Sequence, residues 1–531
     1  METSSGHNPT WDRVAVCMLA LYVVAAAALF THYQYRLNPD GVSYVSIAEK
    51  YARGDALGAI NRHWAPLLSW LTAPAIYFGV PGVAAAKVWL LVAGLAALAA
   101  FVVLLRQFEV TGRPRAIALA SALVCALSFA LTLVTPDVLT VALLAVYYCV
   151  IWSSRYTDSR WAGALCGLLG ALAYLAKNYN FYFFFAHFAA MTAWLHLRSA
   201  TPGAKRTVLL NAATGYAVFL VLSSVWIGMM AHKYGELTIG SAGKYNLLAW
   251  GPDSNGQPMD NGGFLAPPNP TAVSMWEDPS LYMDRMKPWN PLGSWRGLKH
   301  ALLTTLKNAG LALSSGGVIF SVVLLVLARR RNVTLASRVY WLILSVTLYA
   351  AGYLPLIVED RYLWSSKLLG LVLCAALLGA LAARRIGPDL RPRRWPYVLY
   401  LLMFVSAPLA GLITNWNGAK EYFDIAQRLR SEFHVQGNIA SSRGMWHRSL
   451  QAAYYMDAHY YGQPAPDIDG AALEKELAHF DIDYYFVWAL WDPLSNKMAF
   501  PATGAPANLP EIAHGAIPNL RVYACKSSPG G

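Results

Sequence analysis

The sequence has few charged residues for its length. Only 13% of its 531 residues are Asp, Glu, Lys or Arg, whereas 56% are hydrophobic and the mean hydropathy is +0.37. A soluble domain carries roughly 25% charged residues, so this chain cannot cover a water-facing surface in the usual way. Its apolar residues come in runs of about 17–25, the length that crosses a bilayer. The composition therefore excludes a soluble globular protein and favours a polytopic α-helical membrane protein.

Cysteine is also scarce, with six in the whole chain. Five of them lie inside apolar runs, where a thiol behaves as a small hydrophobic side chain. Cys525 stands alone near the C-terminus, and no pair has the spacing of metal ligands. This pattern excludes a disulfide framework and a cysteine-ligated metal site.

Acidic residues are outnumbered by basic ones, which gives a net charge of +13. A nucleic-acid-binding protein would gather this charge on one face. Here the basic residues fall instead in short clusters between apolar runs. This is the pattern of the positive-inside rule, so we expect a lipid bilayer and no nucleic acid as a partner. The clusters are Arg113 with Arg115, Lys205 with Arg206, 329–331 and 391–394.

Eleven apolar segments predict eleven membrane-spanning helices, and together they define a transmembrane domain over 1–414. With the N-terminus in the cytoplasm, the short inside loops are rich in Lys and Arg, whereas the short outside loops hold only Lys177 and Arg361. No small-residue cleavage site follows the first apolar run, so we expect a retained helix rather than a signal peptide. The predicted spans are 14–33, 83–105, 115–134, 138–153, 161–176, 179–197, 207–231, 303–328, 336–357, 362–383 and 396–414.

Three long segments then lie outside. Segment 34–82 predicts a helix after Asp40, followed by an apolar piece at 64–80 that is interrupted by prolines and lies in the membrane interface. Segment 232–302 is rich in Gly, Pro, Asn and Trp and predicts an irregular loop. The third segment is the tail.

The tail, 415–531, alternates predicted helices and strands, which indicates a small soluble α/β domain. It contains no Gly-rich phosphate loop, so a structural or acceptor-binding role is favoured over catalysis. The predicted helices are 418–432, 447–460 and 470–480, and the predicted strands are 437–442, 483–488 and 520–525.

Polar residues at the predicted outer helix ends are the candidates for a functional site. Each has a structural explanation as well: Asp40 alone would serve as a helix cap, and Asp137, behind a proline, as a first-turn acid. Arg361 beside an aromatic residue would serve as an interfacial anchor. Their position on one side of the membrane favours a shared site. The group comprises Asp40, Asp137, Lys177, Glu359, Asp360, Arg361 and Tyr362.

Three of these groups resemble motifs of the GT-C glycosyltransferases, which include bacterial aminoarabinose transferases and protein O-mannosyltransferases. Asp40, in NPDGVSYVSIAEKYARGD before HWAPLLSWL, matches the acid of the first outer loop. Asp137, in VTPDVL, matches the second acidic position, and VEDRYLW resembles the Glu-x-Arg-Tyr segment. The long outer loop and the outer C-terminal domain also fit. The resemblance implies a polyprenyl-phosphate sugar donor and inversion at the anomeric carbon.

The chemistry of such a transfer agrees with these residues. It needs a base for the acceptor hydroxyl and cations for the departing phosphate. We predict Asp40 as the base and Asp137 as its supporting acid. Arg361 has the planar fork that suits phosphate, with Lys177 and Lys367 as further donor-binding cations. Further candidates for substrate binding are Tyr44, His63, Trp64, Glu359, Asp360 and Tyr362.

The sequence does not decide whether a divalent metal ion is bound. Asp40, Asp137 and Glu359 offer the oxygen ligands that such an ion takes. The sequence has no tight Asp-x-Asp motif, so we do not expect an obligatory metal.

Two other classes of function compete with the glycosyltransferase. A transporter or lipid-linked-sugar flippase typically shows repeats and broken helices near mid-membrane, and the sequence indicates neither. A scaffold that binds a partner through its tail would leave the outer-surface residues unexplained. The prediction is therefore a glycosyltransferase of a bacterial plasma membrane, with its tail outside and a lipid, glycan or protein as acceptor.

Overall fold

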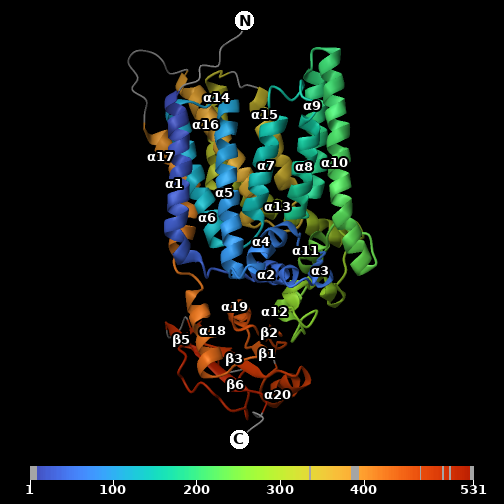
Figure 1. Ribbon diagram of the computed structural model, residues 1–531, viewed down its shortest axis with the longest axis vertical. Coiled ribbons are helices and arrows are strands. Elements are labelled where there is room, and N and C mark those ends of the chain that lie inside the picture. The colour runs from blue at the N-terminus through green and yellow to red at the C-terminus, as the bar shows by residue number, and fades with distance from the viewer. Residues whose placement is uncertain are drawn as a thin grey trace.

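The computed structural model describes residues 9–333, 337–383, 394–466, 468–492, 496–501 and 504–526. Figure 1 shows a bundle of long, roughly parallel helices with a small domain of helices and strands beneath it. The first and the last described residues lie at opposite ends of the molecule. Several short helices form a layer between the bundle and the small domain.

Helices occupy all eleven predicted intervals, with ends that differ by a few residues in most cases. The largest differences are at α13, which begins eight residues before the predicted span, and at α15, which ends six residues before the predicted end. Helices α1 and α10 each begin five residues early. The helices are α1 (Pro9–Tyr33), α5 (Gly82–Gln107), α6 (Gly112–Thr132), α7 (Asp137–Ile151), α8 (Ala162–Ala176), α9 (Asn180–Arg198), α10 (Pro202–Tyr234), α13 (Trp295–Leu313) with α14 (Gly316–Arg330), α15 (Ser337–Ala351), α16 (Trp364–Ala383) and α17 (Trp395–Thr414).

Length and hydropathy together select fewer of these helices as membrane spans. Among the described residues six helices are long and apolar enough to cross a bilayer, and the α13–α14 pair makes a seventh if it counts as one span. Helices α7 and α8 are apolar but only 15 residues long. The prediction of a multi-pass membrane protein is confirmed, while the total of eleven spans stays a prediction.

The prediction of one continuous span at 303–328 is wrong. Helices α13 and α14 meet at an angle of 76° across Ser314 and Ser315. Serine and glycine are poor residues for a helix interior, and two glycines follow the serines. A Cβ at Gly316 would stand 2.7 Å from Met403 Sδ, and one at Gly317 would stand 2.6 Å from Phe404. The glycines therefore let α14 start close against α17. The chain bends at this point instead of continuing as one straight helix.

The layer beneath the bundle comes from the two long outer segments. The predicted helix at Asp40 is α2 (Pro39–Ala52), and the interfacial piece contains α4 (Leu67–Tyr77). The segment predicted as an irregular loop has little regular structure, although it contains two short helices and two 3-10 turns. The remaining elements of the layer are α3 (Ala56–Ala59), α11 (Ala242–Ala249), α12 (Pro258–Asn261), η1 (Met275–Glu277) and η2 (Pro279–Arg285).

The C-terminal segment folds as predicted into helices and a sheet. The sheet has the order β2-β1-β3-β6, in which β1 is parallel to β2 and β3, and β6 is antiparallel to β3. A separate hairpin pairs β4 with β5. The elements are α18 (Lys420–Glu432), β1 (Asn438–Ser441), α19 (Trp446–Met456), β2 (His459–Tyr460), α20 (Gly470–His479), β3 (Tyr484–Trp488), β4 (Leu490–Asp492), β5 (Lys497–Ala499) and β6 (Leu520–Ala524).

Two parts of this domain differ from the prediction: the β4–β5 hairpin was not predicted, and one helix is shorter than expected. The helix expected at 447–460 ends at Met456, because Asp457 adopts a left-handed conformation with φ of 58°. This residue stops the helix, and His459–Tyr460 form β2 beside β1. Sequence periodicity missed the turn because the aromatic residues on both sides of it fit either element.

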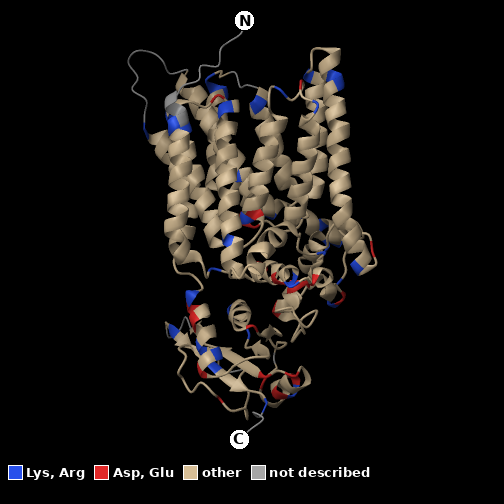
Figure 2. Cartoon of the chain, viewed as in Figure 1, with Lys and Arg blue, Asp and Glu red and all other residues tan. Residues whose placement is uncertain are grey.

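Charge is distributed unevenly along the bundle. Figure 2 shows mainly Lys and Arg at the end away from the C-terminal domain, and most of the acidic residues toward the other end and in that domain. The basic cluster predicted at 391–394 lies outside the described residues except for Arg394. This asymmetry agrees with a cytoplasmic end opposite the C-terminal domain, and the orientation itself remains a prediction.

Cysteine labelling tests the orientation. In a variant with Cys525→Ser, Ala471→Cys on exposed α20 should react with a membrane-impermeant maleimide from outside intact cells. Gly203→Cys, exposed at the start of α10, should react only after the membrane is opened. The reverse pattern would invert the assignment.

Candidate functional site

A cavity of about 1230 Å³ lies where the bundle meets the layer of outer segments. Every candidate residue predicted from the sequence lines it, except Lys367. Residues far apart in the chain meet here because the helix ends and loops that carry them lie at the same end of the bundle. The candidates on the wall are Asp40, Tyr44, His63, Trp64, Asp137, Lys177, Glu359, Asp360, Arg361 and Tyr362.

The start of α2 is fixed against the junction of α6 and α7. The side-chain oxygen of Asn38 accepts a hydrogen bond of 2.9 Å from the backbone N–H of Val134. A Cβ at Gly41 would stand 2.8 Å from the Cβ of Val134, so only glycine permits this approach. Asp40 lies in the first turn of α2 and Asp137 begins α7. The two carboxylates are therefore brought to one wall by backbone contacts.

Both oxygens of the Asp40 carboxylate are held. Arg361 Nη1 donates to Oδ2 at 2.6 Å, and the indole N–H of Trp276 donates to Oδ1 at 3.1 Å. Arg361 also donates through Nε to Glu359 at 2.7 Å. One guanidinium thus bridges two carboxylates, in the planar geometry that arginine offers.

Asp137 forms the second ion pair of the cavity. Lys177 Nζ donates to its Oδ1 at 2.6 Å, and the Thr135 hydroxyl donates to its Oδ2 at 2.8 Å. The Lys177 ammonium lies 4.0 Å from the ring centroid of Tyr362, and the Arg361 guanidinium lies 5.2 Å from the same centroid. Tyr362 therefore contacts the cations of both ion pairs, and the two pairs form one charged cluster.

The aromatic candidates hold the layer together. Trp64 donates through its indole N–H to the carbonyl of Trp276 at 3.0 Å, and its ring packs edge-on against Tyr44. His63 is buried beside them, and burial lowers its pKa to about 3 although Asp40 acts in the opposite direction. His63 is therefore neutral at physiological pH and does not supply a positive charge for phosphate.

Lys367 lies outside the wall of this cavity. It forms an ion pair with Asp360, which does line the cavity, and it borders a small apolar cavity between α5, α6, α7 and α16. A lysine one or two turns inside a span gains from such a pairing, because an unpaired ammonium there is costly.

Sequence reasoning missed several residues of the wall. Trp276 contacts Asp40 directly but lies in a segment without periodicity. Arg36 follows α1, and its Nε is buried with no hydrogen-bond partner in the described part of the chain. No carboxylate pairs with Arg36 within the described ranges. Trp446 extends the wall into the C-terminal domain. Arg36 lies four residues before Asp40 in the sequence, and this closeness could have indicated that it belongs to the site.

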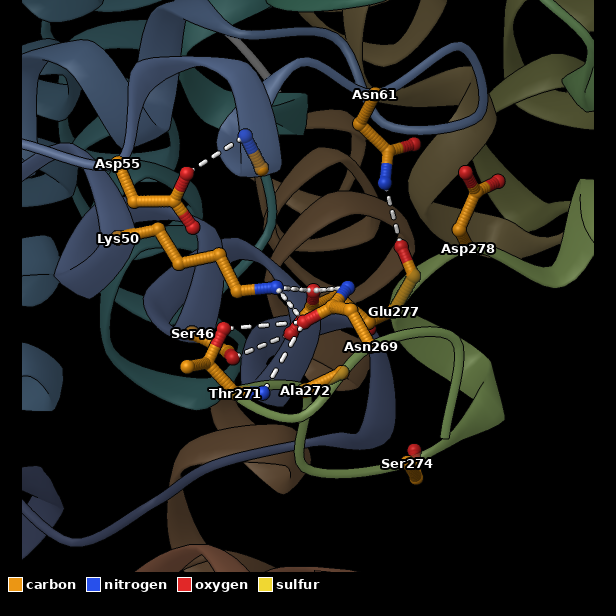
Figure 3. Close-up of polar contacts among 12 residues, drawn as sticks. Ser46, Lys50, Asp55, Asn61, Asn269, Thr271, Ala272, Ser274, Glu277 and Asp278 are labelled. Atoms are coloured by element: carbon orange, nitrogen blue, oxygen red, sulfur yellow. Dashed lines mark hydrogen bonds and ion pairs between the residues drawn. The ribbon is translucent and has the colours of Figure 1, made fainter. Parts of the chain in front are cut away.

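A buried ion pair joins Lys50 to Glu277, the residue that follows Trp276 in the sequence (Figure 3). Lys50 on α2 pairs with Glu277, and both side chains are almost fully buried. Lys50 also donates to Asn269 Oδ1 at 2.8 Å, and Asn61 donates to the Glu277 carbonyl at 2.6 Å. The long outer segment is thereby fastened to α2, the helix that carries Asp40.

The described residues contain no group of three His, Cys, Asp or Glu side chains placed to hold a metal ion. Asp40 and Glu359 are bridged by Arg361, and Asp137 is paired with Lys177. The oxygen set considered from the sequence thus has cations between its members, and it does not fit a divalent ion in this arrangement.

Comparisons with known proteins place the fold. No protein-family model matches the sequence, and no relative is found among curated proteins. The structure is similar to the apo oligosaccharyltransferase of Archaeoglobus fulgidus, with a TM-score of 0.50 and 10% identity over 89% of this chain and 69% of that chain. It is also similar to ArnT from Cupriavidus metallidurans bound to undecaprenyl phosphate, with a TM-score of 0.48 and 14% identity over 96% and 98% of the two chains. Arabinofuranosyltransferase AftD from Mycobacteria gives a TM-score of 0.47 and 14% identity over 99% of this chain and 42% of that chain. The chain shares its fold with this archaeal oligosaccharyltransferase. The sequence motifs predicted a fold of the GT-C type.

Proposed function

We propose that this protein transfers a sugar from a polyprenyl-phosphate donor to an acceptor hydroxyl at the outer surface of the membrane. The observation that carries the proposal is the pairing of Asp40 with Arg361 and of Asp137 with Lys177 in a single cavity. The GT-C fold supports it. Apolar residues from bundle helices, such as Phe129, line the same cavity, so a lipid phosphate and a sugar both find suitable surroundings.

The reaction then proceeds by direct displacement. Asp40 removes the proton of the acceptor hydroxyl, and the oxygen of that hydroxyl forms a bond to the anomeric carbon. The bond between that carbon and the phosphate oxygen breaks, and polyprenyl phosphate leaves with the electron pair. Arg361 and Lys177 stabilise the negative charge that develops on the phosphate. Attack opposite the leaving group inverts the anomeric configuration, as the GT-C resemblance implies.

Arg361 links donor binding to the base. In the structure its guanidinium donates a hydrogen bond to Oδ2 of Asp40, while the indole N–H of Trp276 donates to Oδ1. A donor phosphate competes for the guanidinium and frees Oδ2 to accept a proton, and Trp276 keeps the carboxylate oriented. Arg36 lines the same cavity without a carboxylate partner in the described ranges. Its guanidinium can therefore pair with the phosphate without first breaking an ion pair.

The setting follows from the predicted orientation. The proposed location is a bacterial plasma membrane, with the N-terminus in the cytoplasm and the C-terminal domain over 415–531 outside. Trp446 extends the cavity wall toward that domain, which suits a lipid, glycan or protein acceptor that arrives from outside. The broken α13–α14 pair is a feature of many transporters, but it contributes no residue to the cavity wall.

A transfer assay tests the function. The purified protein in lipid nanodiscs is given a panel of polyprenyl-phosphate sugars with a labelled sugar, together with cell-envelope lipids and glycans as acceptors. We expect release of polyprenyl phosphate and labelled product with at least one donor. Movement of labelled lipid across a proteoliposome membrane without sugar transfer would support a flippase instead.

The substitution Arg361→Lys is expected to raise the KM for the donor by about tenfold or more, with a smaller effect on the acceptor. Lysine keeps the charge but loses the fork, and a hydrogen bond to a charged group contributes roughly 1.5–3 kcal/mol. The measurement is initial rate against donor and acceptor concentration. Arg296→Lys is the matched control, because Arg296 pairs with exposed Asp253 and does not line the cavity. Equal effects of the two substitutions would contradict the phosphate role.

A further inference from the structure

Five side chains that line the cavity have a buried polar atom without a hydrogen-bond partner in the described part of the chain, namely Arg36, His63, Asn178, Tyr245 and Tyr353. Three of these side chains come from segments that hydrogen bonds tie together. Their unpartnered atoms are Nδ1 of His63, Oδ1 of Asn178 and the hydroxyl of Tyr245. Folded proteins leave few buried polar atoms unpaired, and each one calls for an explanation. Three such atoms on one wall indicate a ligand with several hydrogen-bonding groups.

The three side chains come from separate segments that are tied together. The amide nitrogen of Asn178 donates to the carbonyls of Arg62 at 3.4 Å and His63 at 3.3 Å. This fixes the amide, whose oxygen is buried without a hydrogen-bond partner in the described part of the chain. Gly240 has a φ of +134°, and a Cβ there would lie 2.3 Å from the Asn178 amide nitrogen. The next residue, Ser241, donates its backbone N–H to the Arg62 carbonyl at 2.7 Å and so holds the start of α11, which carries Tyr245.

The chemistry of this wall is polar but uncharged. His63 is neutral, so one ring nitrogen donates and the other accepts, and its ring lies 5.1 Å from that of Tyr245. An amide oxygen accepts, and a phenolic hydroxyl does both. The ring of Trp276 lies 5.9 Å from Tyr245 and 6.3 Å from His63. Neutral donors and acceptors beside an aromatic ring suit the hydroxyls and apolar face of a sugar, whereas phosphate needs cations.

The position of the wall connects it to the proposed base. Trp276 borders His63 and Tyr245 and donates its indole N–H to Asp40. We infer that His63, Asn178 and Tyr245 form a subsite that binds the hydroxyl groups of a sugar ring next to Asp40. The inference rests on the proposed function and adds the residues that select the sugar. The ring belongs either to the donor or to the acceptor, and both present the same hydroxyl chemistry.

Tyr245→Phe tests the subsite with a minimal change, since it removes one hydroxyl and keeps the ring. With the donor that the wild-type protein consumes, we expect KM for one of the two substrates to rise by about tenfold, with kcat within about twofold. A higher KM for the donor assigns the subsite to the donor sugar, and a higher KM for the acceptor assigns it to the acceptor. His63→Phe should raise the same KM.

Deoxy-sugar substrates separate binding from packing. The wild-type protein should discriminate against the analogue that lacks the recognised hydroxyl, and Tyr245→Phe or His63→Phe should reduce that discrimination. Tyr174→Phe is the control, because its buried hydroxyl is also unpartnered in the described ranges but lies away from the cavity. Unchanged KM values and unchanged discrimination in an active protein would overturn the subsite and leave the proposed function standing. A wild-type protein that transfers no sugar from any donor would overturn both.

Discussion

Replacing Asp40 by Asn is expected to reduce sugar transfer by about 10²–10⁴-fold, the range that general acid–base catalysis typically contributes. Asparagine keeps the size of the side chain and can still accept a hydrogen bond from Trp276, but it cannot take the proton of the acceptor hydroxyl. Asp40 lies at the cavity wall with its two oxygens held by Arg361 and Trp276. The measurement is transfer in membranes with matched protein levels.

Two controls give this result its meaning. Glu236→Gln removes a carboxylate that also pairs with an arginine, but Glu236 is exposed and does not line the cavity. It should retain full activity. Asp137→Asn reports on the alternative base. If Asp40→Asn transfers sugar like the wild type while Asp137→Asn is inactive, then the roles of the two acids are exchanged.

Replacing Lys50 by Met should destabilise the protein strongly. The substitution leaves the Glu277 carboxylate buried without its cation, and breaking a buried ion pair in this way costs about 3–5 kcal/mol. Lys50 and Glu277 are 0% and 3% exposed, so water cannot replace the lost partner. The midpoint of thermal unfolding in detergent should fall clearly below that of the wild type.

A double substitution distinguishes the ion pair from simple packing. Lys50→Met with Glu277→Met removes both charges, and similar replacements elsewhere are often neutral or stabilising. The double variant should therefore recover much of the lost stability. The exposed pair of Lys420 and Asp424 gives the comparison, since Lys420→Met should leave the unfolding midpoint close to that of the wild type. A double variant as unstable as Lys50→Met would show that the methionine does not fit.

The sequence contained enough information to place the main polar residues. Asp40, Asp137 and Arg361 each stand at an end of a predicted helix, and the odd or even number of spans before them puts them on one side. Topology alone then brings them close, without any knowledge of packing. The same logic failed for Lys367, whose distance along its helix could not show that it faces Asp360 rather than the cavity.

Other features depend on packing that a linear pattern does not contain. Trp276 lies in a segment with no periodicity, and the residue that follows it, Glu277, forms a buried ion pair with Lys50. The bend between α13 and α14 arises where glycines meet Met403 and Phe404. Hydropathy continues across that bend, so the sequence predicted one span. The subsite residues Asn178 and Tyr245 have no motif, and only their open hydrogen-bonding atoms identify them.

A cryo-electron microscopy structure of the protein in nanodiscs with undecaprenyl phosphate tests the assignment of the cavity directly. The phosphate should lie in the cavity within hydrogen-bond distance of Arg361, Lys177 or Arg36. The Arg361 guanidinium should also move away from Oδ2 of Asp40. A phosphate bound elsewhere on the protein, with the Asp40–Arg361 pair unchanged, would contradict the assignment of this cavity as the site of glycosyl transfer.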